Sequence, residues 1–427
     1  MSAGAEARIP GLLGELRAAF ETSDLLFSML PEGALFERPI ALRHPFVFYL
    51  GHLPAFAWNQ VGRGALGLPP MREDFDQLFE RGIDPEDESS TAPESCWPDL
   101  AEILAYRDQV RAALPEAAAL LPSRPEDPLA ARGRVLDLVL EHELMHHETL
   151  LYMFQEREPG QIRWPDHLPR PRGGPGRASR RVEVPAGLIV LGARWSEVDF
   201  GWDNEFEAER HEVPAFVIDS LPVRNQDWLE FWRGTEDLAL WPINWVRADG
   251  QIQVATVSGR VPFALAEGWP VQVTGTAARA YCAARGGRLP TEVELKRAAT
   301  GEPGGGQRSY PWGEADPTTV GGNFGYRSWS PDPVGEHPET ASAWGVEELV
   351  GNGWEWTATP FRPLAGFTPW ARSYPGYSAD FFDDAHDVVF GASWATAPRL
   401  MRPSFRNWYR RGYPYPFTSF RVVTERA

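Results

Sequence analysis

Two histidines four residues apart are the part of this sequence best suited to chemistry. His142 and His146 lie in the segment EHELMHHETLLYM. Residues four apart on an α-helix lie one turn from each other on the same face, so both imidazoles can bind one metal ion. Burying two neutral imidazoles on one face is costly without a shared partner, which favours a metal site. A third ligand must come from elsewhere, and His52, in FYLGHLPAF, is the candidate.

Three imidazoles around one ion resemble the facial arrangement of non-haem iron oxygenases, although imidazole also suits zinc, copper and nickel. Carboxylates to orient the rings are available at Glu141, Glu143 and Glu148. The same segment contains H-E-x-x-H, the zinc-protease motif, in which Glu143 would be the general base. That alternative needs a downstream third ligand, and His167 lies in a Pro- and Arg-rich segment unsuited to a rigid ligand.

Four helical stretches could position these ligands within the first 160 residues. Apolar residues recur at four-residue steps over 12–20 and continue to Met29, and a second stripe over 46–53 follows Pro45. Two further stretches span residues 100–121 and 134–155. Four amphipathic helices predict a bundle, whose core can host a metal site built from inward-facing side chains.

The second half of the chain follows a different pattern. Residues 157–180 are dominated by Pro, Gly and Arg, which predicts a linker. After Val182, short β-branched runs alternate with turns, and helices are expected over 273–284 and 292–300. The predicted organisation is a four-helix domain over residues 1–160, a linker over 161–181 and a mixed α+β domain over 182–427.

Composition narrows the class of protein. The net charge of −18 argues against nucleic acid or an anionic membrane as partner. No apolar stretch is long enough to span a membrane, and the first twenty residues lack the pattern of a signal peptide. Two cysteines, Cys96 and Cys282, are too few for a disulfide scaffold. We expect a cytoplasmic protein that acts on small molecules.

Together these motifs resemble those of the ergothioneine-type sulfoxide synthases. GH at His52 and HELMHHETLLYM are similar to the DinB-type four-helix domain of that family. The second half resembles the formylglycine-generating-enzyme-like domain fused to it, on the segments VEVPAGLIVLG, DNEFEAERHEVPAFVID, PVRNQDWLEF, ARAYCAARGGRLPTEVEL, YPWG, VEELVGNGWEWT, GASWA and LMRPSFRNWY. The resemblance spans nearly the whole chain in the expected order.

The resemblance implies a fold, a metal and an acceptor. The second domain would have a C-type-lectin-like fold, and the enzyme would use iron(II) and O2 to modify the imidazole of hercynine (N-trimethylhistidine). His52, His142 and His146 fall on the family's iron ligands. In the FRNW motif, Asn407 and Trp408 match positions that hold the trimethylammonium end of hercynine, whose charge an aromatic face attracts. Tyr377, in SYPGYSADFF, resembles the active-site tyrosine that donates a proton, although Tyr374 lies only three residues away.

Departures from the family pattern fall on the donor side. Where one branch has an acidic residue after FRNW to grip γ-glutamylcysteine, this chain has Tyr409, followed by Arg410 and Arg411. The first domain carries FERGIDPEDESSTAPESCWPD in place of a basic donor-binding loop. Both changes resemble the selenoneine synthases, which use a selenosugar, so we favour that donor over γ-glutamylcysteine or cysteine.

Two other functions are typical of domains like these, and the residues argue against both. Formylglycine generation requires copper-binding cysteines near the end of the second domain, whose one cysteine is Cys282 in AYCAAR. A lectin-like binding protein without catalysis is the second alternative. It has no need of three histidines arranged around a metal, which argues against it.

Overall fold

The computed structural model describes residues 2–80, 97–370, 374 and 376–424. The chain forms two compact units: unit 1 is Met1–Pro165 with Ala371–Tyr374, and unit 2 is Asp166–Trp370 with Pro375–Ala427. No helix in these ranges is long and apolar enough to cross a membrane. Cys96 and most of the segment FERGIDPEDESSTAPESCWPD lie outside the described residues.

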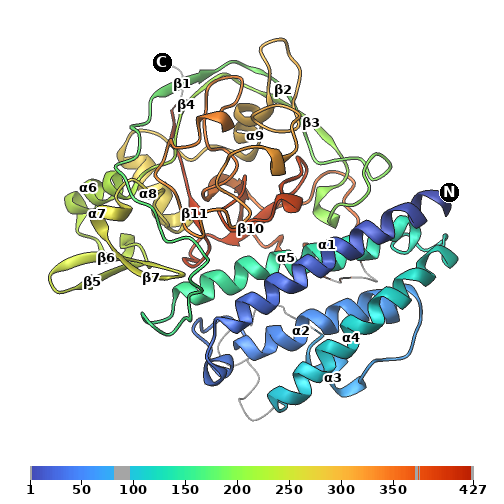
Figure 1. Ribbon diagram of the computed structural model, residues 1–427. Helices are drawn as coiled ribbons and strands as arrows, with labels where there is room; N and C mark the ends of the chain where they lie inside the picture. The colour runs from blue at the N-terminus through green and yellow to red at the C-terminus, as the bar shows by residue number, and fades with distance from the viewer. Residues whose placement is uncertain (1, 81–96, 371–373, 375, 425–427) are drawn as a thin grey trace. The chain divides into compact units, whose positions relative to one another are not determined.

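Unit 1 is a helical bundle. Its long helices are α1 (Ser2–Ser28), α2 (Phe46–Trp58), α4 (Leu100–Leu120) and α5 (Arg134–Gln155), coloured from blue to green in Figure 1. α1 packs along α5, and α2 packs along α4. A π-helix (Asn59–Ala65) and the short α3 (Glu73–Leu78) follow α2. The four helices predicted from apolar spacing are therefore confirmed.

Helix α2 has no exposed face. All 13 of its residues are buried, as expected of a helix that is apolar all round. Pro45 precedes the first helical residue as the N-cap, and its φ of −63° is close to the value that its ring imposes. His52 lies near the middle of α2 and is 0 % exposed, so this polar side chain is carried into the core of the bundle.

Unit 2 is built from small sheets. β1 (Arg181–Val184) and β12 (Val423–Thr424) flank β4 (Phe216–Asp219), so the two ends of unit 2 share one antiparallel sheet. The largest sheet has the order β10 (Asn407–Arg410), β9 (His386–Phe390), β8 (Trp354–Pro360) and β11 (Thr418–Ser419). β2 (Gly187–Leu191) pairs with β3 (Glu209–Val213), and β5 (Trp245–Ala248), β6 (Gln251–Thr256) and β7 (Gly259–Pro262) form a meander.

The α-helices that accompany these sheets in the described part of unit 2 are α6 (Asn225–Thr235), α7 (Phe263–Ala266), α8 (Gly275–Ala284) and α9 (Glu292–Thr300). α9 has the predicted bounds, because Thr291 and Glu294 form a capping box at its start. α8 begins two residues later than predicted, after the N-cap Thr274, whose side chain accepts the backbone N–H of Ala277. The sequence did not predict α6. Large aromatic side chains fill the interior, including Trp228, Trp269, Trp356 and Trp394.

The connecting segment has no helix or strand over residues 166–180, yet it is tied to unit 2 along its length. The Arg172 guanidinium lies 2.9 Å from the Asp332 carboxylate, and Trp269 Nε1 donates to the Arg172 carbonyl. Further along, Arg177 pairs with Glu347, and Arg180 donates to the Gly345 carbonyl. The segment predicted as a linker is therefore irregular in backbone but anchored by its arginines.

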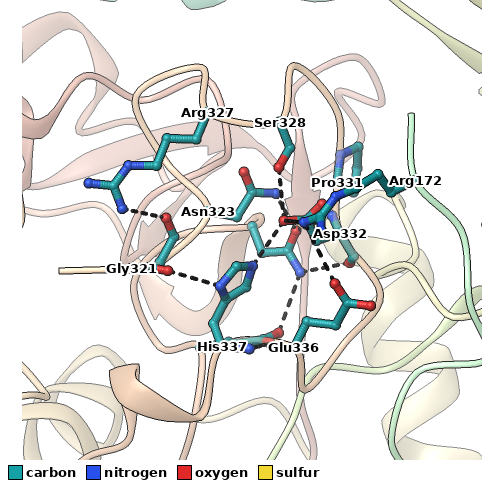
Figure 2. Close-up of polar contacts among 12 residues, drawn as sticks. Arg172, Gly321, Asn323, Arg327, Ser328, Pro331, Asp332, Glu336 and His337 are labelled. Carbon is teal, nitrogen blue, oxygen red and sulfur yellow. Dashed lines mark hydrogen bonds and ion pairs between the residues drawn. The ribbon is translucent and has the colours of Figure 1, made fainter. Parts of the chain in front are cut away.

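Asp332 is the centre of this anchorage (Figure 2). One carboxylate oxygen, Oδ2, receives the Ser328 hydroxyl, the Arg172 guanidinium and Nε2 of His337, each at 2.9 Å. Nδ1 of His337 lies 2.9 Å from the Gly321 carbonyl, so both ring nitrogens face acceptors. Burial alone would lower the pKa of His337, but the Asp332 hydrogen bond and the charges of nearby carboxylates, including Glu348, raise it to about 9. This histidine is therefore protonated at neutral pH.

Candidate metal centre

Three imidazoles converge in the core of unit 1. Nε2 of His142 lies 3.1 Å from Nε2 of His52 and 3.2 Å from Nε2 of His146. One nitrogen of each ring lies within 4.8 Å of the other two. Among the described residues, this is the one group of His, Cys, Asp and Glu side chains with metal-binding spacing. The structure thus brings together the three histidines expected as ligands.

A backbone carbonyl fixes the orientation of His52. Its Nδ1 lies 2.7 Å from the carbonyl oxygen of Phe79. A carbonyl can only accept, so Nδ1 carries the hydrogen and Nε2 of the neutral ring carries a lone pair. Such a bond to the far nitrogen is typical of metal-binding histidines. For His52 this role belongs to the backbone rather than to a glutamate.

Aromatic rings from α2 hold two of the imidazoles in place. Phe56 stacks on His142, with ring centroids 3.6 Å apart and planes 10° from parallel. Phe48 lies against His52 at 5.0 Å and 15°. These phenylalanines are four residues before and four residues after His52, so one face of α2 supplies a ligand and the rings that restrain two of the imidazoles.

Burial keeps the three rings neutral. Desolvation lowers the pKa of His52 to about 4, opposed by the Phe79 carbonyl. The pKa values of His142 and His146 are also well below the ordinary value, first because of burial and then because of the histidines beside them and, for His146, the charge of Arg43. Nδ1 of His146 is buried and has no hydrogen-bond partner in the part of the chain that the structure describes. Neutral imidazoles whose nitrogens face one another are the donor set that a divalent transition metal accepts, so these residues fit such an ion.

Glu143 does not face this centre. It accepts a hydrogen bond from the Ser23 hydroxyl of α1, and its side chain is only 1 % exposed there. A zinc protease of the H-E-x-x-H type needs this carboxylate beside the metal to act on water. His167, the downstream ligand that this alternative would need, is exposed. The geometry therefore argues against a zinc hydrolase.

The predicted acceptor residues lie on β10 in unit 2. Trp408 stacks on Phe361 with centroids 4.1 Å apart and planes 7° from parallel. Tyr377 meets Trp408 edge-on at 5.4 Å, and Phe381 lies 5.6 Å from it. Asn407 accepts the backbone N–H of Trp408 at 2.9 Å through its Oδ1 atom. Tyr377, Asn407 and Trp408 are thus grouped, and Trp408 lies among aromatic rings.

The two candidate tyrosines belong to different groups. Tyr377, in unit 2, stacks on Trp202 with centroids 4.1 Å apart. Tyr374 groups with unit 1, where its ring centroid lies 5.3 Å from that of Phe56 and 6.1 Å from that of His142. Each tyrosine therefore has a distinct aromatic environment.

Tyr409 and Arg411, which follow Trp408, contact other residues of unit 2. Successive strand residues point to opposite faces, so Tyr409 points away from the face that carries Trp408. It packs against the aromatic core of unit 2. Nε of Arg411 lies 3.0 Å from both carboxylate oxygens of Asp387, which is 0 % exposed. Arg410 is exposed. Of the two arginines that could hold a donor carboxylate, Arg411 therefore has an internal partner.

Several residues of these groups had no role in the sequence prediction. They are Ser23, Phe48, Phe56, Trp202 and Phe361. Trp202 directly precedes the motif DNEFEAERHEVPAFVID. The motif itself gives no indication that this tryptophan stacks on Tyr377. Phe48 and Phe56 could have been found, because they lie one turn on either side of His52 on the same helix.

Comparison with known proteins assigns both units. Residues 169–426 match the Sulfatase-modifying factor enzyme 1-like domain family, and residues 15–150 match the DinB superfamily. The hercynine oxygenase of Mycolicibacterium smegmatis is 39 % identical over 71 % of this chain and 73 % of its own length. The hercynine oxygenase of Mycobacterium tuberculosis is 36 % identical over 81 % of this chain and 82 % of its own.

A longer fungal protein matches almost the whole chain. Ergothioneine biosynthesis protein 1 of Neurospora crassa is 31 % identical over 97 % of this chain. The match covers 57 % of the fungal protein, so this chain spans little more than half of that relative's length.

Proposed function

The chain belongs to the ergothioneine sulfoxide synthase family, which contains oxygenase enzymes, and from this premise we propose that it joins selenium or sulfur to the imidazole of hercynine. The reaction would depend on iron(II) and O2 and would leave a new carbon–selenium or carbon–sulfur bond. The observation that carries the proposal is the convergence of three neutral imidazole nitrogens in unit 1.

His52, His142 and His146 would hold the iron ion through their Nε2 atoms. Iron(II) bound by three imidazoles would supply activation of O2 at its open coordination positions. The surrounding rings keep the ligands neutral and fixed in orientation, since Phe56 stacks on His142 and the Phe79 carbonyl accepts from His52. Phe56 of α2 and the Phe79 carbonyl would therefore orient two of the ligands before any metal binds.

Trp408 and its aromatic neighbours would bind the trimethylammonium end of hercynine. A quaternary ammonium is attracted by the negative face of an aromatic ring and cannot donate a hydrogen bond. Phe361 stacks on Trp408 at 4.1 Å and restricts the orientation of the indole ring that would meet the ligand. Asn407 stabilises the local backbone by accepting the Trp408 N–H.

Tyr377 would donate a proton during the reaction. Its phenol can pass a proton and hold a hydrogen bond in one site. Stacking on Trp202 and the edge contact with Trp408 restrict the ring, which favours a fixed hydroxyl position. Tyr374, beside His142, is the natural comparison because the same deletion of a hydroxyl can be made there.

For the donor we favour a selenosugar. γ-Glutamylcysteine carries an ammonium that needs a carboxylate, and burying it unpaired would cost several kcal/mol. Tyr409 stands in the sequence where the family places that carboxylate, and Arg411 is committed to Asp387. Sugar hydroxyls avoid the charge penalty, because neutral groups can pair with them.

A thiol donor is the second candidate. Its support is the names of the relatives: the matched proteins are hercynine oxygenases and ergothioneine biosynthesis proteins, and ergothioneine contains sulfur. γ-Glutamylcysteine and cysteine would both fall under this alternative. We also propose the cytoplasm as the compartment, in keeping with a chain of two cysteines.

Product mass is the deciding experiment. The iron-loaded protein would be incubated in air with hercynine and one donor at a time: a selenosugar, γ-glutamylcysteine or cysteine. A hercynine conjugate containing selenium is expected. Conjugates formed only from a thiol would return the chain to the sulfur branch, and absence of any conjugate from all donors would refute the proposed reaction.

A further inference from the structure

Helix α5 carries a second pair of polar residues with the same four-residue spacing as the metal ligands. Glu143 and His147 each follow a ligand by one residue, so they face about 100° away around the helix. There they meet Ser23 of α1. The Ser23 hydroxyl donates to Glu143 Oε1, and Ser23 Oγ lies 2.8 Å from His147 Nε2.

This polar group is sealed inside unit 1. Ser23 and His147 are 0 % exposed, and Glu143 is 1 % exposed. A serine beside a histidine suggests a nucleophile and its base, but a substrate could not reach this one. The hydrogen bonds of this group restrict the rotation of α5 more than apolar packing would. Hydrogen bonds have narrow preferred distances and angles, whereas apolar contacts tolerate small rotations of a helix.

A second contact holds the beginning of the same helix. Arg8 of α1 lies 3.0 Å from both carboxylate oxygens of Asp137, which is 0 % exposed. Arg8 and Ser23 come in the same order along α1 as Asp137 and His147 along α5. The two helices therefore run in the same direction and are fastened at two points, as the side-by-side ribbons in Figure 1 illustrate.

We propose that Ser23 is a positioning residue for the metal centre, acting through Glu143 and His147. A helix turns as a rigid body, so fixing the face toward α1 also fixes the direction of His142 and His146. Their Nε2 atoms then stay in reach of His52, 3.1 Å from it in the case of His142. This inference rests on the metal site of the proposed function, but not on the reaction.

Cobalt(II) is a suitable probe, because its visible absorption reports the geometry of its ligands and it needs no turnover. Ser23→Ala should weaken cobalt affinity about tenfold or more, in the range known for residues that orient ligands. Its cobalt spectrum should also change in band position, which loss of stability alone would not cause. Ser23→Thr retains the hydroxyl and should restore both readouts.

Thr22→Ala is the matched control. It removes a hydroxyl from the neighbouring position of α1, where Thr22 donates to the Ala18 carbonyl of its own helix. Should Ser23→Ala fail to fold, the double variant Ser23→Ala/Glu143→Leu removes the hydroxyl together with its acceptor, which leaves fewer unpaired groups. Its cobalt spectrum should be shifted in the same way.

The outcomes are distinct. Parental cobalt affinity and spectrum in Ser23→Ala, or in the double variant, would overturn the positioning role while leaving the metal site intact. A parent protein that binds no cobalt would overturn both the site and this inference. A parent that binds cobalt, but whose iron form makes no product, would refute the proposed reaction, and the spectra would still decide the role of Ser23.

Discussion

Nε2 of His52 and Nε2 of His142 face each other at 3.1 Å, although the hydrogen of His52 is on its other ring nitrogen. The two histidines are 90 residues apart in sequence, on α2 and α5, and both are buried. Close approach of buried imidazole nitrogens is favourable when a cation lies between them.

Each of the three histidines should be necessary for metal binding. Changing His52, His142 or His146 singly to Ala should reduce iron(II) affinity by more than about 100-fold, because one of three ligands is lost. Metal content after dialysis measures this directly. His167→Ala, at an exposed position, is the control and should bind the parental amount. Full iron occupancy in His52→Ala would remove His52 from the ligand set.

Deleting the Tyr377 hydroxyl should slow turnover without disturbing the fold. Tyr377→Phe keeps the ring that stacks on Trp202, and loss of a general acid typically lowers the rate by about 10²–10⁴-fold. Tyr374→Phe is the matched variant, at a ring 6.1 Å from His142, and we expect its kcat to stay near the parental value. A large loss of kcat in Tyr374→Phe, with none in Tyr377→Phe, would exchange the two roles.

Trp408 should govern the choice of hercynine over histidine. Trp408→Ala removes the aromatic face and should raise the KM for hercynine about tenfold, as expected for loss of one cation–π contact and its packing. Iron content should be unchanged. Trp408→Phe keeps a smaller aromatic face, so its KM for hercynine should lie between those of the parent and of Trp408→Ala. If the parent uses histidine as well as it uses hercynine, recognition of the trimethylammonium group by Trp408 is wrong.

Donor preference should favour the selenosugar in direct competition. With equal concentrations of selenosugar, γ-glutamylcysteine and cysteine, kcat/KM should be highest for the selenosugar. Arg410→Ala and Arg411→Ala provide a matched pair. Arg411→Ala should lower stability by about 1–3 kcal/mol, because it removes a partner from buried Asp387, whereas exposed Arg410 should have little effect. A preference for either thiol that Arg410→Ala abolishes would instead identify Arg410 as a donor carboxylate ligand.

Protonated His337 should make unit 2 more stable in acid than in alkali. Its folded pKa of about 9 is above the ordinary 6.5, so its contribution is complete below pH 6.5 and is lost as pH rises through 9. The difference corresponds to roughly 3 kcal/mol at most, since one pKa unit is worth about 1.4 kcal/mol. The Tm difference between the parent and His337→Gln should therefore be large at pH 6 and small near pH 10. A difference that does not change with pH would show that His337 is neutral in the folded protein.

Features that depend on residues close together in the sequence could be predicted from the sequence. The spacing of His142 and His146 placed both on one helix face, and Thr291 with Glu294 marked the start of α9. Where a side chain meets a distant partner, spacing carries no information. The contact of Ser23 with Glu143 spans 120 residues, and H-E-x-x-H alone suggested that Glu143 faces a metal. Trp408 likewise stacks on Phe361 of another segment, a pairing that only the folded chain creates.

The complete burial of α2 has an evolutionary consequence. A helix without an exposed face offers few positions at which a mutation is neutral, so descendants of this protein should change there slowly. Exposed side chains such as Arg410 carry no such restriction. A lineage could therefore acquire a new donor through a few surface changes in unit 2 while inheriting the histidine-bearing core of unit 1 almost untouched.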